Sequence, residues 1–333
     1  MPKTGLTERE IIAIFKRRFD SKPKLPLGFD DDVAAFPISR SRLLVLKTDM
    51  FVGSTDVPPG MTLAQAARKA VVATVSDFAA KGVQPRGLLV SLGLAPPVSL
   101  PTVSEIASGL KEGAREYGCR ILGGDTSETD DLVIDCIGFG FAKTRRILPR
   151  DGAKPGDIVA VTGDFGSTSA GLRILLAKKR LWPRRFSKLV YSVLHPAAKL
   201  ETGLKLARTG FVNSSIDSSD GLAWSLHEIA RLSSVNIVVE RIPIARDVEI
   251  FAQEERLSAE KLALFGGEEY ELVLTVQKDR FASLKRKVPS LLRIGTVEKG
   301  RGQVWAQFGD RMVGVEPRGY DHFRYPSRQY LRD

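Results

Sequence analysis

Aspartates that stand beside glycine, serine or another aspartate recur along this chain, and they are the residues best suited to chemistry. Mg²⁺ prefers carboxylate oxygens, commonly one or two per ion, with phosphate and water completing its shell. Aspartates from separate segments could therefore converge on a magnesium site that holds phosphate groups. The same neighbours are ordinary in turns and helix caps, so each aspartate taken alone favours a turn. The segments are Asp30-Asp31-Asp32, Asp49, Asp77, Asp125 in Gly123-Gly124-Asp125-Thr126, and Asp217 with Asp220 in Ile216-Asp217-Ser218-Ser219-Asp220-Gly221.

The sequence carries neither common nucleotide signature. It has no GxxxxGK[ST] loop and no GxGxxG placed between a strand and a helix, so ATP binding cannot rest on a P-loop. Gly163 to Ser169 follows an expected strand and precedes an expected helix. Free backbone N–H groups there could bind a phosphate, or the segment could be a tight turn, and the residues favour neither.

Composition indicates a globular, non-secreted protein. The 333 residues are 43% hydrophobic and 27% charged, which suits one large or two ordinary domains. No apolar run approaches the roughly 20 residues of a membrane span, and the N-terminus carries charges where a signal peptide would be apolar. We therefore expect no membrane segment and a cytoplasmic location. Two cysteines, Cys119 and Cys136, suit a reducing compartment, and three scattered histidines argue against zinc.

The net charge of +11 leaves nucleic-acid binding open as an alternative function. The basic residues are spread out, with denser stretches at Lys178 to Lys188 and in the tail from 326 to 333. A solvated helix end and a basic tail account for these stretches more simply. A basic surface also favours small anionic substrates.

Helical and strand patterns interleave along the whole chain, which predicts an α/β or α+β fold. The expected helices include one opened by the capping box Thr7 to Glu10, one from Thr62 to Ala80 stopped by Gly82, and one from Val103 to Tyr117. Further helices are expected at 169–181, 197–207 and 220–232, and strands at 43–46, 88–94, 132–141, 157–162, 235–240 and 271–276. The Pro- and Gly-containing segment 144–156 predicts a boundary between domains at 1–143 and 150–325.

Taken together, the motifs resemble the thiamine-monophosphate kinase family, within the aminoimidazole ribonucleotide synthetase-like superfamily. Eight segments match in the family's order, and they span residues 28 to 323. They are Asp31-Asp32-Val33-Ala34, Thr48-Asp49-Met50-Phe51-Val52, Val75 to Gly82, Gly123-Gly124-Asp125-Thr126, Gly156 to Gly163, Asp217-Ser218-Ser219-Asp220-Gly221-Leu222, Gly266-Gly267-Glu268-Glu269-Tyr270-Glu271-Leu272 and Gly319-Tyr320-Asp321-His322-Phe323. Any one of them is weak, but eight in order are specific.

The resemblance implies a two-domain synthetase-like fold, with an N-terminal sheet domain that pairs with its copy in a homodimer and a C-terminal α/β domain. It implies transfer of the γ-phosphate of ATP to thiamine monophosphate, with several Mg²⁺ ions in the cleft between the domains. The positions that match magnesium ligands are Asp32, Thr48, Asp49, Asp77, Asp125, Asp217 and Asp220. Those that match ATP contacts are Gly124, Arg150 and Ser219, and those that match contacts to the thiamine moiety are Glu268 and Tyr320.

Five positions depart from the common bacterial pattern of the family. Asp30 stands where glycine is usual, Lys47 where a small polar residue precedes the Thr-Asp pair, and Thr74 where asparagine is common. Asp56 replaces a substrate-side histidine, and Glu269 replaces an aspartate. We expect Asp56 to remain on the substrate side, because a carboxylate would attract a cationic thiazolium.

The implied chemistry requires no general base, because a phosphate monoester has its second pKa near ~6 and is largely ionised at neutral pH. We therefore expect direct in-line transfer with no catalytic base and no membrane or nucleic-acid partner. The alternatives that stay open are another ATP-dependent superfamily member, such as aminoimidazole ribonucleotide synthetase, a member that binds nucleotide without turnover, and a basic nucleic-acid-binding protein.

Overall fold

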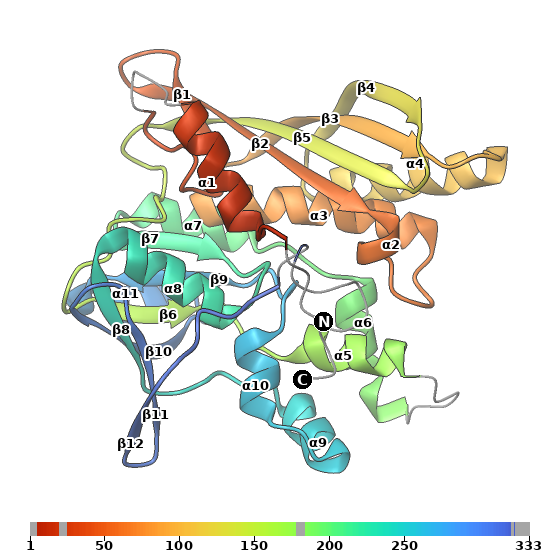
Figure 1. Ribbon diagram of the computed structural model, residues 1–333. Coiled ribbons are helices and arrows are strands. Elements are labelled where there is room, and N and C mark those ends of the chain that lie inside the picture. Colours follow the sequence, from red (N-terminus) through yellow and green to blue (C-terminus); the bar gives the residue numbers. More distant parts are fainter. Residues whose placement is uncertain (1–4, 20–24, 178–183, 321–322, 324–333) are drawn as a thin grey trace.

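The computed structural model describes residues 5–19, 25–177, 184–320 and 323. The expected basic tail from 326 to 333 lies outside these residues, as do 178–183 of the basic stretch. The fold is mixed α/β with two separate sheets, as the sequence predicted (Figure 1). Within the described residues, no helix has both the length and the apolar character that crossing a membrane requires.

The first sheet is built wholly from the N-terminal part of the chain. Its strands are β1 (Ala34–Pro37), β2 (Arg42–Val52), β3 (Pro85–Leu94), β4 (Arg120–Glu128) and β5 (Val133–Lys143), in the order β1-β2-β5-β3-β4. Only β3 and β4 pair in parallel. The helices α3 (Leu63–Lys81) and α4 (Leu100–Glu116) lie along one face, and among the described residues no helix covers the other face (Figure 1).

The second sheet is built from the C-terminal part. Its strands are β6 (Ile158–Val161), β7 (Val212–Asp217), β8 (Val235–Val239), β9 (Leu272–Val276), β10 (Leu292–Lys299), β11 (Val304–Phe308) and β12 (Arg311–Gly314), in the order β12-β11-β8-β10-β6-β9-β7. The associated helices are α7 (Leu200–Thr209), α8 (Leu222–Ser233) and α11 (Phe281–Lys287). Beside the sheet lies a group of shorter helices, α5 (Ser167–Leu176), α6 (Ser187–Leu194), α9 (Arg246–Glu255) and α10 (Ala259–Phe265) (Figure 1).

Helix α3 is the central element, because it packs on the first sheet and also on α7 and β7. Fifteen of its nineteen residues are buried. Local signals set its ends as expected: Thr62 and Gln65 form a capping box, and Gly82 ends the helix in the left-handed conformation with φ +64°. The approach of α7 is so close that a Cβ on Gly203 would lie 1.9 Å from the carbonyl oxygen of Ala79. One hydrophobic cluster therefore joins both parts of the chain.

Two strands differ from expectation in a way that matters for the site. The strand expected at 43–46 belongs to β2, which runs on to Val52, so Asp49 lies inside a strand and not after one. The segment around Gly123 and Gly124 is part of β4, which the sequence did not predict. Backbone pairing explains both, since β2 pairs with β5 over its full length and β4 pairs with β3. Ladder hydrogen bonds override the weak strand preference of Asp, Lys and Gly.

Candidate metal and phosphate site

A cleft of about 1120 Å³ is lined by residues of α3, β2, the end of β7 and α8, and by residues of α1 (Glu8–Arg18). Ten of the residues expected at the site line it: Asp32, Asp49, Asp56, Asp77, Arg150, Asp217, Ser219, Asp220, Glu268 and Tyr320. Segments that lie far apart in the sequence therefore share one cavity.

Three buried carboxylates form the centre of the cleft. Asp32 comes from the loop before β1, Asp77 from α3 and Asp217 from the end of β7, and one ligand oxygen of each lies within 4.8 Å of the others. The Ser76 hydroxyl donates a hydrogen bond of 2.7 Å to Asp217 Oδ2 and so orients that carboxylate. A cluster of oxygen donors with this spacing is the type of ligand set that Mg²⁺ prefers.

Cationic side chains of the protein also reach these carboxylates. The Lys47 ammonium lies 2.8 Å from Asp77 Oδ2. Fully buried Lys81 lies 2.7 Å from Asp32 Oδ2 and 2.6 Å from Asp31 Oδ1. The Arg150 guanidinium contacts Asp32 as well, and its backbone N–H donates to Asp31. The cleft thus carries part of the positive charge that its acids require.

The three carboxylates are compensated by this positive charge to different extents, and their pKa values differ accordingly. Burial alone would raise the pKa of Asp32, but Arg150 and Lys81 outweigh burial and lower that pKa to about 2. Burial, followed by the charge of Asp32, raises the pKa of Asp217 to about 6. Burial likewise raises the pKa of Asp77 well above its usual range, with Lys47 opposing and Asp217 adding to the effect. Asp77 and Asp217 are therefore the acids that a further cation would stabilise most.

Two buried lysines of α3 were missed by the sequence analysis: Lys69, which lines the cleft, and Lys81, which contacts Asp31 and Asp32. Lys69, Asp77 and Lys81 lie on one row of α3 at multiples of four residues, which places them on the same side of the helix. Lys69 is buried and pairs with Glu268 Oε1 at 2.5 Å, beside the expected substrate contacts. The spacing was visible in the sequence, but a lysine in a helix is ordinarily solvated, and only packing on both sides of α3 shows otherwise.

The segment that carries Glu268 has an unusual backbone. Glu268 and Tyr270 both adopt left-handed conformations, with φ of +63° and +52°. Such strain in residues other than glycine concentrates at functional sites. At the same end of the cleft, the Asp56 carboxylate accepts a hydrogen bond from the Val52 backbone N–H, and the backbone N–H of Tyr320 donates to Asp220 O.

Three expected site residues, Thr48, Gly124 and Asp125, do not line the cleft of the single chain. Thr48 follows Lys47 and precedes Asp49, so its side chain points to the opposite face of β2. Strand register places Asp125 on that same face, in one row with Ser91, Asp135 and Met50. This is the sheet face that no helix covers, and the Thr48 hydroxyl there donates to Asp135 Oδ1.

The segment from Gly163 to Ser169, considered as a phosphate site, already holds an anionic side chain. Glu269 Oε1 accepts hydrogen bonds from the backbone N–H groups of Gly166, at 2.7 Å, and Thr168, at 3.1 Å. These are the free N–H groups at the start of α5 that a phosphate would have used. Glu269 does not line the cleft, so its replacement of an aspartate affects this internal contact and not the substrate side.

We expect Glu269→Gln to change the pH dependence of stability. Burial raises the pKa of Glu269 from 4.5 to about 7, although the Thr168 and Gly166 contacts oppose the shift. An acid whose pKa is raised on folding makes the protein less stable as pH rises from its unfolded pKa through its folded pKa. Thermal unfolding at pH 5 and pH 8 should therefore show the variant gaining stability relative to the parent as pH rises. A difference that stays constant or reverses would contradict this assignment.

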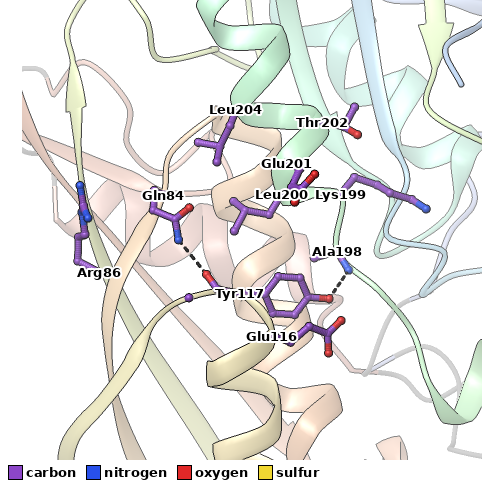
Figure 2. A pocket seen from close by; sticks show the side chains of 11 residues that line it. Gln84, Arg86, Glu116, Tyr117, Ala198, Lys199, Leu200, Glu201, Thr202 and Leu204 are labelled. Carbon is purple, nitrogen blue, oxygen red and sulfur yellow. Dashed lines mark hydrogen bonds between the residues drawn. The ribbon is translucent and has the colours of Figure 1, made fainter. Parts of the chain in front are cut away.

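A second hollow, of about 660 Å³, lies at the junction of α4, α7 and the start of β3 (Figure 2). Its polar groups already serve contacts between these elements. The Tyr117 hydroxyl accepts from the Ala198 backbone N–H at 2.9 Å, and the Gln84 side chain donates to Tyr117 O at 2.8 Å. The hollow therefore lies at the contact between the N- and C-terminal parts. Its described lining residues include no group of acids like the three carboxylates of the cleft.

Comparison with known proteins places the chain among close relatives. A family model described as AIR synthase related protein, N-terminal domain, matches residues 30–142. A thiamine-monophosphate kinase of Nitrosopumilus maritimus is 38% identical over 96% of this chain and 99% of its own length. One of Pyrococcus horikoshii is 36% identical over 96% of this chain and 97% of its own length. The structure of AaThiL complexed with AMPPCP and TMP matches with a TM-score of 0.84 at 29% identity, covering 95% of this chain and 97% of that one.

Proposed function

The chain belongs to the thiamine-monophosphate kinase family, and we infer that it is an ATP-dependent kinase that transfers the γ-phosphate of ATP to thiamine monophosphate, giving thiamine diphosphate. The resemblance predicted from eight ordered motifs is thereby confirmed. The activity is a phosphate transfer in thiamine biosynthesis, and it is favoured over a synthetase of the same superfamily. The observation that carries the assignment is the relationship over nearly the full length, combined with a cleft centred on three buried carboxylates.

The donor set of the cleft fits Mg²⁺. Asp32, Asp77 and Asp217 present oxygens close enough to share a cation. The pKa values of Asp77 and Asp217 are raised first by burial and then by neighbouring carboxylates, and a bound cation would offset both effects. We propose that these three residues, with Asp49 and Asp220 on the same walls, hold several Mg²⁺ ions. We also keep Gly124, Arg150 and Ser219 as proposed contacts to ATP.

In the proposed reaction the side chains compensate charge and do not transfer protons. The phosphate of thiamine monophosphate is largely ionised at neutral pH, so we assign no catalytic base and propose direct in-line attack. Mg²⁺ held by Asp32, Asp77 and Asp217 would neutralise negative charge between the two phosphates. Arg150, whose guanidinium is fixed by Asp32 at the cleft wall, adds positive charge on the side of ATP. Ser76, through its bond to Asp217, keeps that carboxylate directed into the cleft.

The substrate end of the cleft is acidic. Asp56, Glu268 and Tyr320 line it, and the first two carry carboxylates that would attract the positively charged thiazolium of thiamine. Buried Lys69 lies between them, with its ammonium on Glu268 and 3.1 Å from the Asp56 carbonyl oxygen. We propose that this group distinguishes the thiamine moiety from other phosphorylated metabolites.

We further propose that the enzyme works as a homodimer in the cytoplasm. The uncovered face of the first sheet exposes Leu46, Met50, Leu89 and Phe141, which are between 39% and 63% exposed. An apolar surface of this kind on a sheet marks an interface, and a second copy is the occupant that the family resemblance implies. Thr48, Gly124 and Asp125 would then lie at or beside the junction between subunits. The two buried free thiols, Cys119 and Cys136, fit a reducing compartment.

Incubation of the purified protein with ATP, Mg²⁺ and thiamine monophosphate, followed by chromatography, tests the proposal. We expect thiamine diphosphate and ADP in equal amounts, with no product when EDTA replaces Mg²⁺. Hydrolysis of ATP without thiamine diphosphate would favour a superfamily synthetase, and nucleotide binding without any turnover would favour a member that has lost catalysis. Tight, steeply salt-dependent binding to DNA in the absence of turnover would favour the nucleic-acid alternative.

A further inference from the structure

The Lys47 side chain lines the cleft and contacts one of the three carboxylates that could share a metal ion. Its ammonium lies 2.8 Å from Asp77 Oδ2, and its side chain is 23% exposed. Burial lowers the pKa of Lys47, but the negative charges of Asp77, and then of Asp49 and Asp32, outweigh burial and raise that pKa. Asp77 itself belongs to the trio that could share a divalent ion. The ammonium therefore sits on one of the ligands that the proposed magnesium site depends on.

Strand geometry directs the side chain at this position toward the cleft. In β2, residues two apart point to the same face, so Lys47 projects beside Asp49 toward α3 and the cleft. A small polar residue at this point, as in the common bacterial pattern that the resemblance implies, would be too short to contact Asp77. The four-carbon stem of lysine spans that distance and delivers a positive charge that the small residue cannot supply.

We propose that the Lys47 ammonium permanently takes one cation position of the cleft, so that this chain binds one divalent ion fewer than it would with a small residue at position 47. The inference rests on the proposed function. A tethered ammonium keeps a high local concentration at Asp77 and cannot be lost by dilution, whereas Mg²⁺ must be bound from solution. The pairing of charges supports the assignment, since Lys81 and Arg150 both pair with Asp32, whereas Lys47 pairs with Asp77.

Counting bound ions tests the proposal without relying on turnover. Mn²⁺ would be measured by equilibrium dialysis and by the electron paramagnetic resonance signal of the free ion, with AMPPCP and thiamine monophosphate present. The proteins would be the parent, Lys47→Ser and Lys47→Arg. We expect Lys47→Ser to bind one additional Mn²⁺ per chain and Lys47→Arg to match the parent, because arginine keeps the charge. Lys47→Gln, which is closer in length to lysine, answers the same question if Lys47→Ser does not fold.

Equal ion counts in the parent and in Lys47→Ser, whatever their affinities, would overturn the proposal and show that the ammonium withdraws when ions enter. Such a result would leave the kinase assignment intact, because thiamine diphosphate formation is measured separately. No bound Mn²⁺ in any of the proteins would instead overturn the magnesium site and this inference together.

Discussion

Replacing Asp217 by asparagine is expected to lower kcat by about 10²–10³-fold, the loss typical of removing one charged group that stabilises a transition state. The substitution removes a buried charge from the centre of the carboxylate trio and keeps the shape of the side chain. The asparagine oxygen can still accept the hydrogen bond from Ser76, so the local packing is retained. Steady-state kinetics at saturating ATP and thiamine monophosphate would measure the loss.

The same variant should be at least as stable as the parent when no metal is present. Burial, followed by the charge of Asp32, raises the pKa of Asp217 from 3.8 to about 6, so the parent loses stability as pH rises through this range and carries the full penalty of the ionised carboxylate at pH 8. Thermal unfolding in EDTA at pH 8 should therefore favour the variant, and added Mg²⁺ should stabilise the parent more than the variant. A stability loss equal to the activity loss would contradict a role in metal binding.

Asp157→Asn is the matched control for this prediction. Asp157 is as buried as Asp217, at 5% against 4% exposure, but it lies outside the cleft and accepts hydrogen bonds from Asn213. We expect the control to change stability and to leave kcat within about twofold, because charge lost away from the phosphates costs little transition-state energy. Comparable losses of kcat in the two variants would contradict the prediction. They would show that removing any buried aspartate lowers kcat, whether or not it lies in the cleft.

A charge at the centre of the uncovered sheet face should break the proposed dimer and reduce turnover with it. Leu89 lies on β3, between β5 and β4, and is 43% exposed in the single chain. Glutamate at this position would be tolerated by the monomer but would be buried in the dimer, raising the dissociation constant by about 10²-fold. Because Asp125 and Thr48 lie on the same face, turnover should decrease in parallel with the dimer fraction.

Sedimentation at several protein concentrations, together with kinetics at the same concentrations, would measure both quantities. Leu100→Glu is the control, since Leu100 is 79% exposed at the start of α4, on the helical side of the sheet. A Leu89→Glu protein that remains dimeric would place the interface elsewhere. A monomer with full turnover would show that Thr48, Gly124 and Asp125 act within one chain or not at all.

The elements that the sequence predicted best are those set by neighbouring residues. The capping boxes at Thr7 and Thr62 and the glycine after Lys81 define helix ends through contacts within a few residues, and the structure has all three. The full extent of β2 and the existence of β4 depend on partners far along the chain. Asp49 and Asp125 thus appeared to follow strands or turns, when they belong to strands held by β5 and β3.

Prediction of the site residues was likewise limited to what the sequence shows without the contacts between distant segments. The aspartates could be selected from the sequence because the motifs occur in a recognised order, and ten of the expected residues share one cleft. The lysines could not be selected, because nothing local shows that Lys69 and Lys81 are buried against acids from other segments. The sequence also could not show that Glu269 turns away from the cleft to the start of α5. These contacts exist only once both parts of the chain pack around α3.

The central claim is that the carboxylate cluster brings a divalent cation to the phosphates of both substrates, and phosphorus NMR tests it directly. Mn²⁺ added in trace amounts broadens the resonance of any phosphorus atom close to it. In a complex with AMPPCP and thiamine monophosphate, we expect broadening of the nucleotide phosphates and of the thiamine monophosphate resonance, the latter only when the protein is present. Asp217→Asn should abolish the second effect. A thiamine monophosphate resonance that stays sharp in the parent complex would contradict the account.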